Sequence, residues 1–188
     1  MRYFKKLKGE RLYLSPINVE DASRYCEWIN DMNVTVKLGR PSFLLSVETE
    51  KEALEDLVKG GSTFAIILND VDKLIGNCGL MAIDHLNQNA ELGIMIGDKA
   101  YWNNGYGTEA IRLLLNYGFN ILNLHNIMLR VFSFNERAMK CYKKCGFKEI
   151  GRRRGDYVIG KERYDSVYMD ILATEFNGQL NTLFPEGF

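Results

Sequence analysis

One segment constrains the fold more than any other: an apolar strand at residues 90–96 that leads through a glycine-containing turn into a long amphipathic helix. The turn reads Asn103-Asn104-Gly105-Tyr106-Gly107-Thr108. Glycine permits a sharp turn and a close backbone approach, and the first N–H groups of a helix have no intrahelical acceptor. These donors and the helix dipole predict an anion site, suited to a pyrophosphate, at the start of the helix.

Two familiar nucleotide-binding patterns do not fit this turn. The dinucleotide pattern G-x-G-x-x-G lacks its third glycine because Ala110 stands there, and the phosphate-loop pattern lacks its Gly-Lys-Ser/Thr. Nucleotide hydrolysis and dinucleotide redox chemistry therefore lose their sequence support. Considered alone, the turn is also compatible with a purely structural role as a tight turn before a helix.

The remaining chain divides into strands and helices by its hydrophobic periodicity. Asn18 and Ser46 are suited to cap helices, and Gly60-Gly61 is suited to end the second of these. Residues 31–45 show no clear period and are predicted to form a loop. Strands are predicted at residues 11–16, 63–68, 73–82, 90–96, 126–132, 148–157 and 164–173, and helices after Asn18 and at residues 46–59, 108–121 and 136–145.

This order, β-α-α-β-β-β-α-β-α-β-β, predicts an α/β (α+β) fold with one mixed sheet that has antiparallel and parallel parts. The last two strands are expected to form a hairpin around residues 158–161. In the helix at 46–59, the spacing predicts that Ala53, Leu54, Leu57 and Val58 face the core.

Length, charge and composition narrow the function. A chain of 188 residues with 46% hydrophobic residues predicts a single domain, 1–188, with a core at about 10–173 and a tail at 177–188. Lys plus Arg and Asp plus Glu both number 24, so no net field favours nucleic acid. The first residues lack the apolar stretch of a signal peptide, and no run is long enough to span a membrane. We expect a soluble cytoplasmic protein.

The cysteines and histidines do not predict a metal site. Among four cysteines only Cys141 and Cys145 lie close in sequence, at a helical spacing, and the chain has two histidines. We expect reduced thiols and no metal.

A second motif, downstream of the turn, narrows the interpretation of the turn. Downstream of a strand stands the run Asn135-Glu136-Arg137-Ala138-Met139-Lys140-Cys141-Tyr142-Lys143-Lys144-Cys145-Gly146-Phe147. It resembles the N-x-x-A-x-x-x-Y-x-K-x-G-F helix of the GNAT family of N-acetyltransferases. Trp102-Asn103-Asn104-Gly105-Tyr106-Gly107 resembles the same family's Arg/Gln-x-x-Gly-x-Gly/Ala acetyl-CoA loop. The two motifs occur in the family's order, and the resemblance covers about residues 10–173.

Within the family, the chain is most similar to the branch of ribosomal-protein alanine acetyltransferases and spermidine acetyltransferases. The similarity rests on Ala90-Glu91-Leu92-Gly93-Ile94, on Gly107-Thr108-Glu109-Ala110 and on the closing run at residues 160–165. Trp102 replaces the family's usual Arg or Gln, and Asn104 stands where many relatives have Lys or Arg. We therefore expect pyrophosphate binding to rely on backbone donors and the helix dipole.

The resemblance implies a fold and a cofactor site. It implies a sheet of six to seven strands, mostly antiparallel, flanked by about four helices and splayed at a central parallel pair. It implies acetyl-CoA as cosubstrate, with Ile94 and Ile96 offering backbone groups to its pantetheine arm and Asn135 bonding the same arm. Helix N-cap is the alternative role of Asn135. The predicted pyrophosphate loop comprises Trp102, Asn103, Asn104, Gly105, Tyr106, Gly107 and Thr108.

The resemblance also implies direct transfer of acetyl to a primary amine in a ternary complex. An alkylammonium, with a pKa of about 10.4, must lose a proton before it attacks. Glu91 is the candidate base, directly or through water, and a strand-edge ion pair is its alternative role. Tyr142 matches the family tyrosine that protonates or hydrogen-bonds the departing CoA sulfur, and its alternative role is core packing.

The acceptor and the assembly are less constrained. A polyamine such as spermidine is the first candidate acceptor, a peptide or protein N-terminus the second, and an aminoglycoside or amino sugar the third. His85, Tyr164 and Asp165 are further residues that could face the acceptor, and structural roles are the alternative for each. A non-catalytic acetyl-CoA sensor is the competing function. A homodimer or larger homo-oligomer is compatible with the resemblance.

Overall fold

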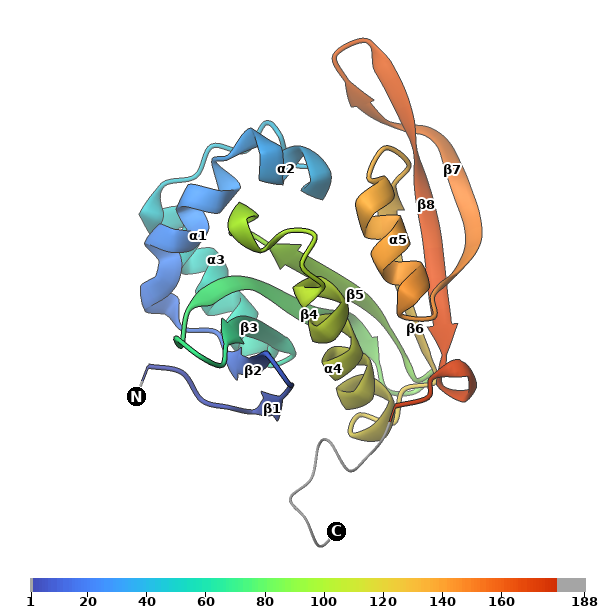
Figure 1. The fold of residues 1–188 in the computed structure, drawn as a ribbon. Coiled ribbons are helices and arrows are strands. Elements are labelled where there is room, and N and C mark those ends of the chain that lie inside the picture. Colours follow the sequence, from blue (N-terminus) through green and yellow to red (C-terminus); the bar gives the residue numbers. More distant parts are fainter. Residues whose placement is uncertain (1, 179–188) are drawn as a thin grey trace, which may run out of the picture.

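The computed structural model of the protein describes residues 2–178. In this range an eight-stranded sheet carries helices on both faces (Figure 1). The strands are β1 Leu7–Lys8, β2 Leu12–Pro16, β3 Thr63–Leu68, β4 Leu74–Asp84, β5 Asn89–Ile96, β6 Asn126–Phe132, β7 Lys148–Ile159 and β8 Glu162–Leu172. The helices are α1 Ala22–Ile29, α2 Met32–Leu38, α3 Val47–Gly60, α4 Tyr106–Asn120 and α5 Glu136–Lys144, with 3-10 turns at Val19–Asp21, Lys99–Tyr101 and Ala173–Glu175.

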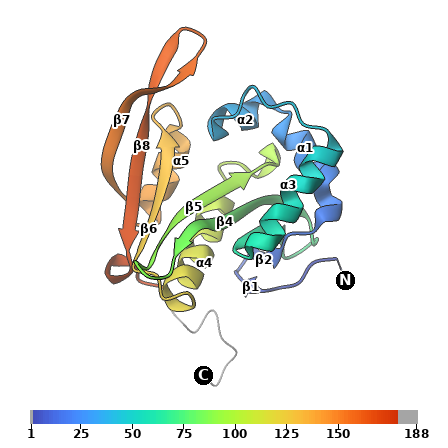
Figure 2. The same ribbon diagram turned by 180° about the vertical axis from the view of Figure 1, so that it is seen from behind.

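The sheet forks at its only parallel pair within the described residues. The strand order is β1-β2-β3-β4-β5-β6-β8-β7, and every neighbouring pair except β5 and β6 is antiparallel. The register of β5 with β6 covers only Asn89–Glu91 against Asn126–Met128. Beyond this point the two strands diverge, as both views show (Figures 1 and 2). The prediction of a mixed sheet splayed at a central parallel pair is confirmed.

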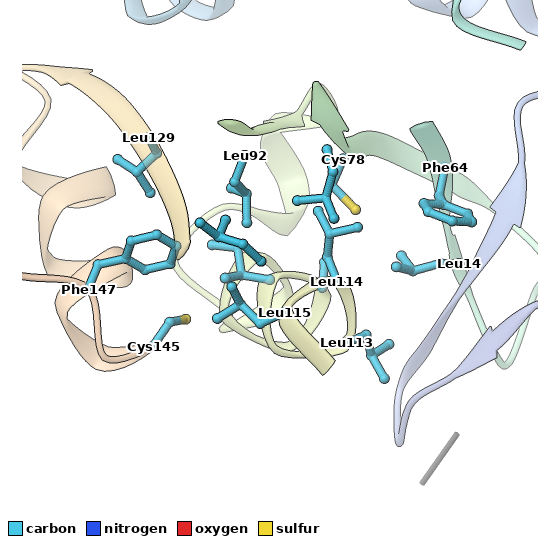
Figure 3. Packing of buried hydrophobic residues seen from close by; sticks show 14 of the residues in the cluster. Leu14, Phe64, Cys78, Leu92, Leu113, Leu114, Leu115, Leu129, Cys145 and Phe147 are labelled. Carbon is cyan, nitrogen blue, oxygen red and sulfur yellow. The ribbon is translucent and has the colours of Figure 1, made fainter. Parts of the chain in front are cut away.

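Two apolar layers cover the faces of the sheet. On one face, α4 and α5 pack on β-strand residues in a cluster that includes Leu92, Leu114 and Leu129, with Phe147 closing it beside α5 (Figure 3). On the other face, α1 and α3 form a second cluster through residues such as Trp28 and Leu54. Because side chains alternate along a strand, β5 contributes Ala90 and Leu92 to the first layer and Met95 to the second.

The segment at residues 31–45, predicted as a loop, contains a helix. Asp31 caps α2 through a 2.8 Å hydrogen bond that its Oδ1 accepts from the Asn33 backbone N–H. Gly39 ends the helix in the left-handed region, at φ 74°. Two turns of helix are too short for a periodic signal, so the caps were the only sequence indication.

Several other boundaries also differ from prediction. The sheet has eight strands rather than six to seven because β1 pairs Leu7 and Lys8 with β2. The final hairpin turns tightly at residues 160–161, since β7 continues to Ile159. In α3, Leu54 is buried as predicted, but Ala53 and Val58 are exposed.

Within residues 2–178, no helix is both long and apolar enough to cross a lipid bilayer. Most of the tail predicted at 177–188 lies outside the described residues.

Candidate active site

The fork leaves the backbone of β5 with unused hydrogen-bonding groups. The Gly97 N–H donates to Ile75 O, toward β4, whereas Gln88 O accepts from His125 N, toward β6. Backbone groups alternate in direction along a strand, so those of Ile94 and Ile96 point toward β6. The register with β6 ends at Glu91, so these groups face the open part of the fork, where only Ile96 O has a partner among the described residues, the Trp102 indole.

The loop before α4 presents a second set of free donors. Gly105 is the N-cap of α4, at φ 82°, and it has no side chain to cap the helix. The first backbone bond of α4 runs from Glu109 N to Gly105 O at 3.1 Å. The N–H groups of Tyr106, Gly107 and Thr108 have no acceptor in the described part of the chain. They form the predicted anion site at the positive end of the helix dipole.

Arg11 fixes this loop from the start of β2. Its guanidinium donates to Asn104 O at 2.9 Å and forms an ion pair with Glu109 at 2.9 Å. The Glu109 carboxylate also accepts from the Arg11 backbone N–H at 2.8 Å. The Arg11 Cζ lies 4.5 Å from the centroid of the Tyr106 ring. The loop is therefore held by a side chain distant in sequence.

Trp102 links the loop to β5 and to two cations. Its indole Nε1 donates to Ile96 O at 2.6 Å. Lys37 Nζ of α2 lies 3.9 Å from the Trp102 ring centroid, and Arg137 Cζ of α5 lies 4.0 Å from it. Tertiary contacts thus bring Arg11, Lys37 and Arg137 against a loop that has no charged side chain of its own. The expectation that pyrophosphate binding relies on backbone donors stays a prediction.

The start of α5 lies against the start of α4. Asn135 is the N-cap of α5 and accepts from Ala138 N at 3.3 Å, so its structural role is present. The Thr108 hydroxyl lies 3.2 Å from Cys141 Sγ. Hydrogen bonds from Cys145 and Thr108 and the charges of Lys144 and Arg137 lower the pKa of the Cys141 thiol. Cys145 in turn donates to Thr108 O at 3.7 Å.

Tyr142 lies on the α5 face that packs against the sheet. Its ring meets Phe147 edge-on at 6.0 Å between centroids. Its hydroxyl has no hydrogen-bond partner among residues 2–178, so core packing does not occupy its polar end. Burial, followed by the nearby Cys141, raises the pKa of Tyr142 above its usual value, so the group stays protonated over the neutral range.

Glu91 sits at the apex of the fork. It is the last β5 residue in register with β6, opposite Met128. Since Ala90 and Leu92 face α4, Glu91 faces the other side of the sheet, beside Met81. The alternative role as an ion-pair member finds no partner for Glu91 in the described chain. Glu91 and Tyr142 thus belong to opposite faces of the sheet.

An aromatic wall closes the β6 side of the fork. We use this name for the rings of Phe132, Phe134, Tyr157 and Tyr164. Phe132 stacks on Tyr157 with 4.2 Å between centroids, and Phe134 meets Tyr164 edge-on at 4.9 Å. The Tyr157 hydroxyl is buried without a partner in the described structure. A Cβ built on Gly39 would lie 2.6 Å from Phe132 Cζ, so α2 ends in close contact with this wall.

Other residues singled out from the sequence have simpler surroundings. Asp165 accepts from Gly155 N at 2.9 Å and so braces the final hairpin. His85 is exposed and lines a shallow groove of about 390 Å³ between α3 and β4, together with Asp56 and Met81. No group of three metal-ligating side chains occurs in residues 2–178.

Sequence reasoning missed the residues that reach the loop from elsewhere. Arg11 and Lys37 belong to segments without a motif, so no local signal marked them. Arg137 lies inside the quoted helix motif, where its spacing of four from Cys141 placed it on the face toward the loop. This spacing was the only signal that could have identified it.

Comparison with known proteins supports the motif assignment. The family described as Acetyltransferase (GNAT) domain matches residues 11–148. An uncharacterized N-acetyltransferase of Bacillus licheniformis is 33% identical over 177 residues, 92% of this chain and 98% of that protein. The spermidine N(1)-acetyltransferase of Vibrio cholerae is 33% identical over 111 residues, 58% of this chain and 64% of that protein.

The fold is shared with a solved relative. The crystal structure of spermidine N-acetyltransferase from Vibrio cholerae in complex with CoA and spermine has a TM-score of 0.78 and 26% sequence identity. The match covers 89% of this chain and 98% of that one.

Proposed function

Because this chain belongs to the GNAT family of acetyl-CoA-dependent N-acetyltransferases, we propose that it transfers acetyl directly to a primary amine of a polyamine such as spermidine. One observation carries the proposal. The fork between β5 and β6 has Glu91 at its apex on one face and Tyr142 on the other, beside the free helix N-terminus of α4. The proposal treats residues 1–188 as one acetyltransferase domain.

The residues at the fork fit acetyl-CoA. The backbone N–H and C=O of Ile94 and the N–H of Ile96 suit the amides of a pantetheine arm, whereas Ile96 O already accepts from Trp102 Nε1, and Asn135 lies at the start of α5. The free N–H groups of Tyr106, Gly107 and Thr108 suit a pyrophosphate. Acetyl-CoA supplies an activated thioester carbonyl and a thiolate leaving group.

Glu91 acts as the base in this proposal, directly or through one water. A protonated amine cannot attack a carbonyl, so a proton acceptor must lie where the amine enters. Glu91 meets this condition because it lies at the fork apex and forms no ion pair within residues 2–178. Its carboxylate also attracts the ammonium form of the acceptor.

Tyr142 acts as the proton donor to the departing sulfur. Its raised pKa keeps the hydroxyl protonated at neutral pH, and the hydroxyl has no protein partner in the described chain to divert it. Backbone N–H groups of β5 near Ile94 polarise the carbonyl as negative charge develops on its oxygen.

A polyamine fits the acceptor side for two reasons. Alkylammonium groups bind the faces of aromatic rings, and the aromatic wall supplies stacked rings beside the fork. The solved relative whose crystal structure contains CoA and spermine has the same fold at 26% identity. A peptide N-terminus and an aminoglycoside or amino sugar are the second and third acceptors to test.

The test is amine-dependent release of free CoA thiol. Purified protein and acetyl-CoA would be mixed separately with spermidine, spermine, Ala- and Ser-starting peptides, and amino sugars. Release with polyamines alone supports the proposal, and release with another class replaces the acceptor. Acetyl-CoA binding without release for any amine would favour the sensor function instead. Mass measurement in the same preparation would test for a homodimer or larger assembly.

A further inference from the structure

Two cations near the phosphate loop form no ion pair with a carboxylate in the described chain. Within residues 2–178, neither Lys37 nor Arg137 forms a salt bridge or a side-chain hydrogen bond. Other cations around the loop are paired: Arg11 with Glu109 at 2.9 Å, and Lys99 with Asp31 at 2.5 Å. Lys37 and Arg137 thus differ from Arg11 and Lys99, the paired cations beside them.

The two cations are close enough to repel each other. Both lie about 4 Å from the same indole ring, at 3.9 Å for Lys37 Nζ and 4.0 Å for Arg137 Cζ. Both side chains are half-buried. Burial, and then the charge of Arg137, lower the pKa of Lys37. The Trp102 ring offsets part of this cost, but an anion between or beside the cations would offset more.

The position identifies the anion. Trp102 begins the loop whose free N–H groups form the pyrophosphate site, and Asn104 in that loop has no charge. Arg137 lies one helical turn before Cys141, whose Sγ is 3.2 Å from the Thr108 hydroxyl. Lys37 and Arg137 therefore lie against the first residue of the loop, and Arg137 is also on the helix that contacts the start of α4. They are unsuited to a cationic acceptor, which they would repel.

We propose that Lys37 and Arg137 bind the phosphate groups of acetyl-CoA and supply the positive charge that the loop itself lacks. This inference rests on the proposed function insofar as that function requires acetyl-CoA. Because Lys37 lies on α2, which ends at Gly39 against Phe132, cofactor binding also holds α2 beside the aromatic wall. Binding of the cofactor would therefore also position α2 as one wall of the acceptor side.

Binding measurements without any amine test the inference. Lys37→Met and Arg137→Met keep an apolar stem against Trp102 and remove the charge. By calorimetry we expect each to weaken acetyl-CoA binding about tenfold, as for loss of a charge-assisted hydrogen bond. Binding of S-acetyl-pantetheine, which has no phosphate, should change less than about twofold. Lys37→Arg should retain most of the acetyl-CoA affinity.

Lys5→Met is the matched control. Lys5 Nζ lies 4.8 Å from the Tyr13 ring centroid, a similar cation–aromatic contact away from the loop. It should leave both affinities unchanged. Raising the salt concentration should weaken acetyl-CoA binding by the native chain more than by the Lys37→Met, Arg137→Met double variant.

The inference fails if acetyl-CoA binds both variants as tightly as the native protein. It also fails if S-acetyl-pantetheine loses as much affinity as acetyl-CoA, since the two side chains would then act on shape alone. Neither result depends on the acceptor. An enzyme that acetylates peptides rather than polyamines would give the same binding data, so this inference and the polyamine proposal can fail separately.

Discussion

The two flanks of the fork are built in different ways. On the cofactor flank, β5, the loop at 102–108 and the start of α4 present backbone groups, and few side chains take part. On the acceptor flank, α1 to α3 and the β7–β8 hairpin present side chains that meet from distant parts of the sequence. Backbone recognition requires a local conformation, whereas side-chain recognition requires a particular tertiary contact. The first flank is therefore marked by motifs, and the second is not.

The interiors of the flanks differ as well. The cluster under α4 and α5 is almost entirely apolar. The two buried carboxylates in residues 2–178, Asp21 and Glu50, both lie on the acceptor flank. Asp21 accepts from the Tyr3 hydroxyl at 3.0 Å and pairs with Arg2. The acceptor flank thus contains the buried carboxylates of the described chain.

The largest expected effect comes from replacing Glu91 at the apex of the fork, which should lower the rate of acetyl transfer without changing cofactor binding. Glu91→Gln keeps the shape and removes the base, so kcat/KM for the amine should fall about 10³-fold. The Kd for acetyl-CoA should change less than about twofold, because Glu91 makes none of the proposed contacts with the cofactor. Steady-state kinetics and calorimetry measure the two quantities. Near-native turnover in this variant would exclude Glu91 as the base.

The next effect is expected at Tyr142, on the cofactor flank. Tyr142→Phe removes the proton donor and should lower kcat about 10²-fold with little change in the Kd for acetyl-CoA. Burial raises the pKa of Tyr142, so its protonated form persists as pH rises. The kcat of the native enzyme should therefore show no alkaline decline from this group up to about pH 9. A variant as fast as the native enzyme would leave Tyr142 with a packing role.

A smaller effect should be confined to the acceptor flank. In Gly39→Ala the new Cβ would lie 2.6 Å from Phe132 Cζ at a φ of 74°, so α2 must move away from the aromatic wall. We expect the KM for the amine to rise about fivefold, in proportion to roughly 1 kcal/mol of strain. Gly61→Ala is the control, since Gly61 has a similar φ of 69° and open space around it. Equal KM values for the two variants would separate α2 from acceptor binding.

The smallest effect concerns stability. Burial raises the pKa of Glu50, so the folded state holds a proton that the unfolded state releases as pH rises. The contribution of Glu50 is present below its unfolded pKa and is lost as pH rises through the folded value. Glu50→Gln should therefore increase the free energy of unfolding at pH 8 by about 1 kcal/mol, and by less at pH 4. Urea titrations measure both, with the exposed Glu52→Gln as control.

Much of the fold could be predicted because strands and long helices have strong periodic signals. The strand at 126–132 was predicted at its observed bounds, and Ser46 and Asn135 cap helices in the structure. Asn18 caps the 3-10 turn Val19–Asp21 rather than α1 itself, whose N-cap is Asp21. The family resemblance is confirmed by the match over residues 11–148. Short elements were missed, since neither the two residues of β1 nor the seven of α2 give a period.

The site could be predicted only where a sequence motif is typical of a particular local conformation. The loop residues and the helix at Asn135 lie together as the motifs implied, and their binding roles remain predictions. The contacts of Arg11, Lys37 and Phe132 depend on which segments meet in the folded chain. A single sequence without tertiary information does not indicate which distant segments come into contact.

The unpaired edge of β5 has a consequence for inhibitor design. An open strand edge usually invites another strand, and here α4 and α5 pack on one face of the sheet beside the edge. A short, flexible chain with two correctly spaced amides would fit the edge by backbone bonds alone. Substitution of side chains on β5 would do little to exclude such a compound, so resistance to it would have to arise elsewhere in the protein.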